Sequence, residues 1–260
     1  MRFDGKVAII TGAGTGIGRD MAIQFAREGA FVCVAARRER LLEETADLAE
    51  AGGHTRPLVV PTDITVEADV DTMVERAVGR FGRLDFMINN AAFAGTDGWV
   101  HQQTLENWNR VVATNLTSQF LVARASLRHM IPQRSGVILT FSSTAALGAF
   151  ERKSHYTASK LGILGFTRTL AQEVGRHGIR ANTIVPGAVR TELLASYWQR
   201  IAAEQGKAVA ELEREAGERT ALRRIVEPRE VTKTVMFLCS DEASAITGQE
   251  IRVCAGAAFG

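Results

Sequence analysis

Cysteines are few in this sequence, and it has no long apolar run. Cys33, Cys239 and Cys254 are an odd number, widely spaced and without nearby partners of the kind that metal sites show. We therefore expect three buried thiols in a reducing cytoplasm and no bound metal. No stretch approaches the roughly 18 uninterrupted apolar residues that a membrane span requires. The N-terminus also lacks the apolar region and cleavage site of a secretory signal, which again favours a cytoplasmic protein.

Charge of one sign is not concentrated anywhere in the chain. The formal net charge is +2, and the 31 basic residues are scattered along the sequence. This pattern gives no electrostatic reason to expect a nucleic acid or an anionic membrane as a partner. With 46% apolar residues over 260 positions, the chain can bury a substantial core. Pro- or Ser-rich linkers and repeats are missing, so we expect a single domain over residues 1–260.

Short β-branched runs alternate with longer amphipathic stretches along the whole chain. Most of the short runs, such as VAII and GVILTF, are continuously apolar, which is typical of strands buried on both faces of a parallel sheet. Strands are predicted at Lys6–Thr11, Ala30–Ala36, Pro57–Pro61, Leu84–Asn89, Gly136–Ser142, Ile179–Val185 and Glu250–Val253.

The stretches between these strands have the apolar spacing of helices. Helices are predicted at Arg19–Arg27, Val66–Phe81, Glu106–Met130, Ser154–Arg176 and Pro228–Leu238. Successive strand–helix units require right-handed crossovers, so the sequence predicts a doubly wound parallel sheet of the α/β class. Ligands of such sheets bind beyond the carboxyl ends of the strands, where each motif described below falls.

A glycine-rich segment, Thr11–Gly18, follows the first strand and opens the first helix. Its spacing is G-x-x-x-G-x-G, formed by Gly12, Gly16 and Gly18. Glycines let the backbone approach a pyrophosphate closely, and the helix N-terminus offers unpaired N–H groups to the phosphates. Glycines also serve ordinary turns, but the position between a strand and a helix favours a dinucleotide site.

The end of the second strand bears on which dinucleotide binds. An NAD-binding protein normally places an acid there for the ribose 2′-hydroxyl. This sequence has Arg37 and Arg38 instead, and a guanidinium can hold a 2′-phosphate by charge-assisted hydrogen bonds. The alternative is that both arginines begin the next helix in solvent, paired with Glu39 and Glu43. We expect NADP as the cofactor, with NAD as the alternative.

A candidate proton-transfer group lies at the start of a predicted helix. Tyr156 and Lys160 are four residues apart and therefore share one helix face. A nearby ammonium stabilises phenolate and lowers a tyrosine pKa, which makes Tyr156 a plausible acid or base. Ser143, at a strand end 13 residues earlier, can bind a substrate oxygen. The alternatives are an ordinary surface pair and a strand-terminating turn.

Taken together, these motifs resemble those of the short-chain dehydrogenase/reductase family. The resemblance covers almost the whole chain in order, and it also rests on three further motifs: Asn89-Asn-Ala91, Asn115 and Pro186-Gly-x-x-x-Thr191. It implies a Rossmann-type fold with a seven-stranded parallel sheet and helices on both faces. It also implies an oligomer, a homotetramer or a homodimer.

The resemblance further implies the roles of four residues. Tyr156 would be the catalytic acid/base, and Ser143 would orient the substrate oxygen. Lys160 would bind the nicotinamide ribose and lower the pKa of Tyr156, and Asn115 would hold a water in a proton relay. Cofactor contacts are implied at Gly12, Thr15, Gly16, Ile17, Gly18, Arg37, Arg38, Asp63, Ile64, Asn89, Ala91, Tyr156, Lys160, Pro186, Gly187, Val189 and Thr191.

Two places depart from the family pattern. Ala92 replaces the usual glycine of Asn-Asn-Ala-Gly, and Cys254-Ala255 replace the Asp-Gly of Val-Asp-Gly-Gly. The segment 192–220 is longer than a simple connection and has a helical composition. It is expected to be a substrate lid, the alternative being a solvated helical hairpin whose aromatic residues fill a small core.

The sequence therefore predicts an oxidoreductase that transfers a hydride between NADP(H) and a small secondary alcohol or ketone. A 3-oxoacyl-carrier-protein reductase has the same motifs and is the first alternative. A cofactor-binding regulatory protein without catalytic activity is the second alternative, although such proteins often lose the tyrosine or the lysine, and this chain has both.

Overall fold

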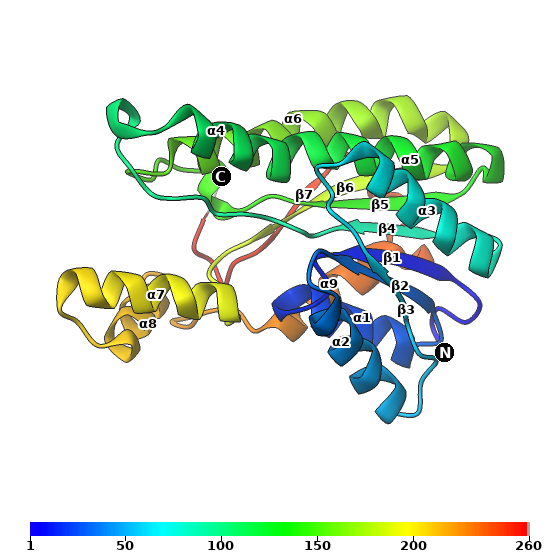
Figure 1. Cartoon of the computed structure of the whole chain (residues 1–260), viewed down its shortest axis with the longest axis horizontal. Coiled ribbons are helices and arrows are strands. Elements are labelled where there is room, and N and C mark those ends of the chain that lie inside the picture. The colour runs from blue at the N-terminus through cyan, green and yellow to red at the C-terminus, as the bar shows by residue number, and fades with distance from the viewer. Residues whose placement is uncertain (259–260) are drawn as a thin grey trace.

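The computed structural model describes residues 1–258 and contains one parallel sheet of seven strands (Figure 1). The strand order is β3-β2-β1-β4-β5-β6-β7, and every neighbouring pair is parallel. The strands are β1 Val7–Thr11, β2 Phe31–Ala36, β3 Leu58–Pro61, β4 Phe86–Asn89, β5 Gly136–Phe141, β6 Ile179–Pro186 and β7 Glu250–Val253. The predicted doubly wound sheet is confirmed, and each predicted strand lies within two residues of its observed bounds.

Helices cover both faces of this sheet. They are α1 Gly16–Arg27, α2 Glu39–Ala51, α3 Glu67–Phe81, α4 Leu105–Val112, α5 Ser118–Gln133, α6 Ser154–Val174, α7 Glu192–Gln205, α8 Val209–Glu218 and α9 Pro228–Cys239. In Figure 1, α1, α2 and α9 lie on one side of the strands, and α3, α5 and α6 lie on the other. This is the arrangement that right-handed crossovers produce.

Strand β1 shows why the strands are apolar at every position. Its side chains alternate between the faces, so Ala8 and Ile10 enter the core beneath α1, α2 and α9. Val7 and Ile9 enter the second core, beneath α3, α5 and α6. All five residues of β1 are buried, because neither face of the strand meets water.

The helices differ from the prediction at two places. Helix α2 is not among the predicted helices, although Leu42, Ala46 and Ala49 have helical spacing and are fully buried. The helix predicted at Glu106–Met130 is present, but it is not α-helical throughout, because a π-helical turn at Ala113–Thr117 lies between α4 and α5. The other predicted helices are present, with ends that differ by up to three residues.

The 192–220 segment forms α7 and α8, which lie beyond one end of the sheet in Figure 1. The two helices enclose a small core of their own, formed by Trp198, Ala202, Leu212 and Ile225. A helical hairpin with an aromatic core was the alternative to a lid, and this packing is compatible with both.

The three cysteines are buried free thiols, as predicted. Burial raises the pKa of the Cys33 thiol to about 12, so this group stays protonated and unreactive at neutral pH. Within residues 1–258, no group of His, Cys, Asp and Glu side chains is arranged to hold a metal ion. None of the helices in this range is long and apolar enough to cross a membrane.

Candidate active site

The glycine-rich turn follows β1, at the switch point of the sheet. The chain builds β2 and β3 on one side of β1 and then returns to place β4 on its other side. Gly12 and Gly16 have positive φ angles of 67° and 53°. A Cβ on Gly12 would lie 2.9 Å from the Ala91 Cα, and one on Gly18 would lie 2.2 Å from the Gly12 carbonyl oxygen. Only glycine fits this turn, because a methyl group would collide with backbone.

The first turn of α1 is open to an anion. Its N-cap residue, Thr15, has an extended backbone, and its side chain accepts no hydrogen bond from the helix. No acidic residue lies in that first turn. The N–H groups at Gly16, Ile17 and Gly18 therefore keep their capacity to donate, and the helix dipole adds positive partial charge. These features fit the pyrophosphate of a dinucleotide.

Arg37 and Arg38 follow β2 and are both exposed. The alternative is confirmed in part, because Arg38 is the N-cap residue of α2 and both arginines lie in solvent. The expected pairing with Glu39 and Glu43 is not seen, since within residues 1–258 neither arginine forms a salt bridge and Glu43 pairs with Arg56. Both guanidiniums are therefore free to bind a ligand at the carboxyl end of β2.

Asp63 lies at the end of the neighbouring strand, β3, and is followed by the buried Ile64. Partial burial opposes ionisation of Asp63, but hydrogen bonds from Thr65 and the charge of Arg37 outweigh it and lower its pKa. Asp63 thus carries a negative charge near Arg37 at neutral pH.

The Asn89–Ala91 turn is tied directly to the glycine-rich turn. The Ala91 N–H donates to the Thr11 hydroxyl at 3.1 Å, and the Asn90 amide donates to the Thr11 carbonyl at 3.0 Å. Asn89 is fully buried, and its amide donates to the Gln119 carbonyl. These bonds bring the ends of β1 and β4 together, so the two predicted parts of the cofactor site are one structure.

The turn after β6 approaches the same place from the other side. A Cβ on Gly16 would lie 3.0 Å from the Thr191 Cγ2, so Thr191 packs against the glycine-rich turn. Thr191 caps α7 by accepting from the Leu194 N–H at 3.3 Å, and Val189 forms a bridge to Val226. Pro186 ends β6, and the Gly187 N–H donates to the Val253 carbonyl at 3.0 Å.

Tyr156 and Lys160 lie on one face of α6, as their spacing predicts. The Lys160 Nζ is 5.7 Å from the centroid of the Tyr156 ring, and the lysine is only 1% exposed. Its ammonium donates to the Phe141 carbonyl at the end of β5, at 2.8 Å. The Ser142 hydroxyl donates to the Lys160 carbonyl at 2.8 Å, which holds α6 against the end of β5.

Ser143 joins Tyr156 from the end of β5. The two side chains are hydrogen-bonded, and the Ser143 Oγ also accepts from the Ala145 N–H at 3.2 Å. Ser143 therefore both caps a short helical turn and reaches the phenol, so the strand-terminating turn that was the alternative coexists with the predicted contact. Sequence reasoning missed Phe141 and Ser142 as anchors of Lys160, because a backbone carbonyl leaves no signal in the sequence.

The expected effect of Lys160 on the Tyr156 pKa is not what this structure shows. Burial raises the pKa of Tyr156, and the hydrogen bond from Ser143 only partly opposes it. Burial also lowers the pKa of Lys160, to about 7, so the ammonium loses its proton more readily than an exposed lysine does. Loss of solvation dominates for both groups, and Tyr156 is a protonated phenol at neutral pH.

Asn115 lies in the π-helical turn and is fully buried. Its carbonyl accepts from the Phe93 N–H at 2.8 Å, and its amide donates to the Phe93 carbonyl at 2.9 Å. The same amide donates to the Ser159 hydroxyl at 3.1 Å. Asn115 thus joins the segment after β4 to α6. Its partner in α6, Ser159, follows Tyr156 by three residues.

The two departures from the family pattern have different consequences. Ala92 is exposed and has no positive φ, so the methyl group introduces no backbone strain. Ala255 has a φ of 52°, in the region that favours glycine. Cys254 packs against the Pro186 turn, because a Cβ added to Gly187 would lie 2.9 Å from the Cβ of Cys254.

Comparison with known proteins agrees with this geometry. A family model described as enoyl-(acyl carrier protein) reductase matches residues 12–258. The chain is 37% identical to the short chain dehydrogenase/reductase astE of Aspergillus oryzae, over 97% of this chain and 94% of the relative. It is 33% identical to the 3-oxoacyl-(acyl-carrier-protein) reductase FabG of Thermotoga maritima, over 98% and 99%. The chain belongs to the short-chain dehydrogenase/reductase family.

Solved structures of short-chain dehydrogenase/reductases superpose closely on this chain. An actinorhodin polyketide ketoreductase with NADPH has a TM-score of 0.92 at 32% identity, covering 97% of each chain. A 7α-hydroxysteroid dehydrogenase with NADH and 7-oxo glycochenodeoxycholic acid has a TM-score of 0.90 at 31% identity, covering 98% of this chain and 95% of that one. The predicted family and fold are confirmed, and the protein is an oxidoreductase of this family.

Proposed function

We propose that this protein interconverts a secondary alcohol and the matching ketone with NADP(H), and that Tyr156 exchanges the proton. The observation that carries the proposal is the junction of Ser143, Tyr156 and Lys160 beside the glycine-rich turn. A bound nicotinamide supplies or accepts the hydride. The chain's own residues then have to hold the cofactor, orient the substrate oxygen and move one proton.

The proton step follows from the protonation states of the site. With its raised pKa, Tyr156 carries its proton at neutral pH and donates it to the oxygen of a ketone as that oxygen gains negative charge. Ser143, hydrogen-bonded to the phenol, is placed to donate to the same oxygen. The Lys160 ammonium lies beneath the ring and stabilises the phenolate that remains. Tyr156 is thus already in the protonation state from which the reduction begins.

Asn115 is proposed to support the same step by holding the segment after β4 against α6. The water that the family resemblance assigns to Asn115 would use the remaining acceptor capacity of its amide carbonyl. The cofactor is proposed to contact the glycine-rich turn, Asp63, the Asn89–Ala91 turn and the Pro186–Thr191 turn. The glycine-rich turn packs against the other two turns through Ala91 and Thr191. The 192–220 segment is proposed as the substrate lid beside them.

We propose NADP rather than NAD because Arg37 and Arg38 are exposed and unpaired with carboxylates within residues 1–258. A 2′-phosphate would satisfy both guanidiniums. The solved relatives hold NADPH in one case and NADH in the other, so the arginines carry this preference. Reduction of a 3-oxoacyl group on a carrier protein is the second candidate, supported by the likeness to the Thermotoga maritima reductase.

The test of the proposed function is the substitution Tyr156→Phe, which removes only the exchangeable hydroxyl. We expect ketone reduction, followed by loss of NADPH absorbance, to fall by about 100-fold or more, since general acid catalysis contributes roughly 10²–10⁴-fold. Binding of NADPH, measured by calorimetry, should be retained and serves as the control for folding. Turnover by Tyr156→Phe equal to that of the wild type would refute the mechanism.

A further inference from the structure

The segment between β4 and α4 is fastened to the start of α6 by His155, which is fully buried. Its Nε2 lies 3.1 Å from the Ala94 carbonyl, and its Nδ1 lies 3.2 Å from the Gln103 amide nitrogen. A carbonyl requires a donor and an amide NH₂ requires an acceptor, so the ring is a neutral Nε2–H tautomer. The Gly98 N–H also donates to the Arg152 carbonyl at 3.0 Å. The loop and the helix start therefore form one unit.

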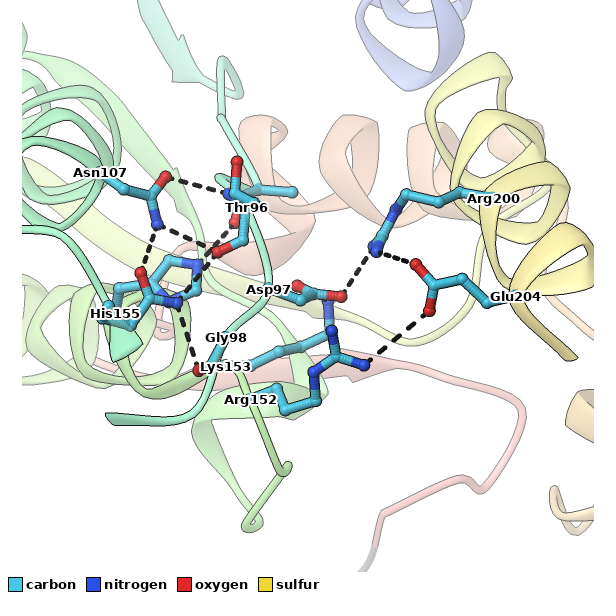
Figure 2. Close-up of polar contacts among 11 residues, drawn as sticks. Thr96, Asp97, Gly98, Asn107, Arg152, Lys153, His155, Arg200 and Glu204 are labelled. Atoms are coloured by element: carbon cyan, nitrogen blue, oxygen red, sulfur yellow. Dashed lines mark hydrogen bonds and ion pairs between the residues drawn. The ribbon is translucent and has the colours of Figure 1, made fainter. Parts of the chain in front are cut away.

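Asp97 lies at the centre of this unit, and its side chain is only 6% exposed. Its Oδ1 accepts from the Lys153 ammonium at 2.9 Å, and its Oδ2 accepts from Arg200 at 2.7 Å (Figure 2). Burial opposes ionisation of this carboxyl, but the two cationic donors outweigh it and lower its pKa. Asp97 is therefore a buried anion that is neutralised from two sides.

The two cations come from different parts of the protein. Lys153 is the N-cap residue of α6 and precedes Tyr156 by three positions, whereas Arg200 lies on α7. Both cations also lie over the ring of Tyr197, at 4.4 Å and 5.2 Å from its centroid. Glu204 of α7 forms a second link to the helix start, to Arg152 at 3.8 Å (Figure 2).

From this arrangement we propose that Asp97 is a positioning residue that clamps the 192–220 segment closed over the substrate beside Tyr156. That a substrate lies beneath the segment rests on the proposed function. The clamp itself, the contacts of Asp97 with Lys153 and Arg200, rests on the structure. Its physical basis is the burial of the Asp97 carboxylate, because opening α7 removes Arg200 and leaves this buried anion with one of its two cationic partners, Lys153. By contrast, the Arg214–Glu218 pair on α8 is exposed on both sides and contributes little.

The kinetic prediction uses Asp97→Asn, which keeps the volume and removes the charge. The lid opens more readily, so we expect the KM for a ketone to rise by at least about tenfold, with a smaller change in kcat. Asp97→Glu restores the charge and should recover most of the lost affinity. A role in packing alone predicts the reverse order, because the larger glutamate overfills a buried position.

The clamp is also tested without any turnover, by limited proteolysis of the folded protein under native conditions. Asp97→Asn and Arg200→Gln should each speed cleavage within residues 192–220 by at least about tenfold, since both break the same buried pair. The double variant should be cleaved no faster than the faster single variant, because the two side chains act through one contact. Arg214→Gln, an equal loss of charge on the same segment, is the matched control and should be cleaved like the wild type.

The outcomes separate the two proposals. If the wild type reduces no ketone, the proposed function fails while the proteolysis still tests the clamp. Multiplicative rates in the double variant, or wild-type cleavage in both single variants, would overturn the clamp. If Asp97→Asn does not fold, as judged by circular dichroism, the comparison of Arg200→Gln with Arg214→Gln decides it, since Arg200 is 42% exposed and its loss leaves no cavity.

Discussion

The substitution Gly18→Ala tests whether the glycine-rich turn is a cofactor cradle. The added Cβ would lie 2.2 Å from the Gly12 carbonyl oxygen and 2.8 Å from the Asn90 Nδ2. In folded proteins a Cβ atom stays at least 3.0 Å from a non-bonded heavy atom of this kind. The gap between the new Cβ and the Gly12 carbonyl oxygen therefore has to widen by 0.8 Å or more. Gly12 also packs on Ala91, and the shift therefore spreads to the turn after β4.

The magnitude follows from the same displacement. A misplacement of about 1 Å in a binding group costs roughly 100-fold, or about 2.7 kcal/mol. We therefore expect the Kd for NADPH, measured by calorimetry, to rise by about 100-fold in Gly18→Ala. Thermal unfolding should show that the variant still folds, because the strain is confined to the turn. The same strain should lower its Tm.

The matched control is Gly79→Ala in α3, where an added Cβ meets nothing within 4 Å. The same chemical change in an unobstructed helix should leave the Kd unchanged and stabilise the protein by about 0.5–1 kcal/mol. If folded Gly18→Ala bound NADPH with wild-type affinity, the glycine-rich turn would not be the cofactor-binding turn. Weakened binding in Gly79→Ala would show that the effect is not specific to the turn.

Three further predictions concern charge and backbone strain. Arg37→Ala should lower kcat/KM for NADPH by about 10- to 100-fold, since hydrogen bonds to charged groups contribute roughly 1.5–3 kcal/mol, and should leave NADH turnover unchanged. Arg40→Ala, three residues further along in α2, is the control, and an equal loss in both variants would contradict the assignment. Lys160 has its pKa lowered from 10.5 to about 7 by burial, so from pH 7 to 10 the unfolded state binds one proton more and this lysine makes stability rise with pH. Urea unfolding of the wild type relative to Lys160→Met should show that rise, up to about 1.4 kcal/mol per pH unit, and a flat difference would contradict the lowered pKa of Lys160. Ala255→Gly should raise the free energy of unfolding by about 0.5–1 kcal/mol because it relieves the positive φ of 52°, and a loss of stability would contradict that reading.

The sequence determined the class of fold because both faces of the sheet are covered. Strands such as Val7–Thr11 then have to be apolar at every position, and this pattern is readable without a structure. The π-helical turn between α4 and α5 was not readable, because it accompanies the fit of Asn115 against Phe93 and Ser159. Periodicity alone continues smoothly through such a turn.

For the site, the sequence by itself singled out the residues that are proposed to carry the chemistry. The spacing of Tyr156 and Lys160 places them on one helix face, and the glycines mark the turn that only glycine can form. Tertiary structure decided the protonation states, because burial raises the pKa of Tyr156 and lowers that of Lys160, and burial depends on the whole fold. It also decided that Asp97, Lys153 and Arg200 meet, since the two ion pairs join residues 56 and 103 positions apart in the chain. Contacts over such separations are set by how the elements pack, and no local pattern in the sequence records them.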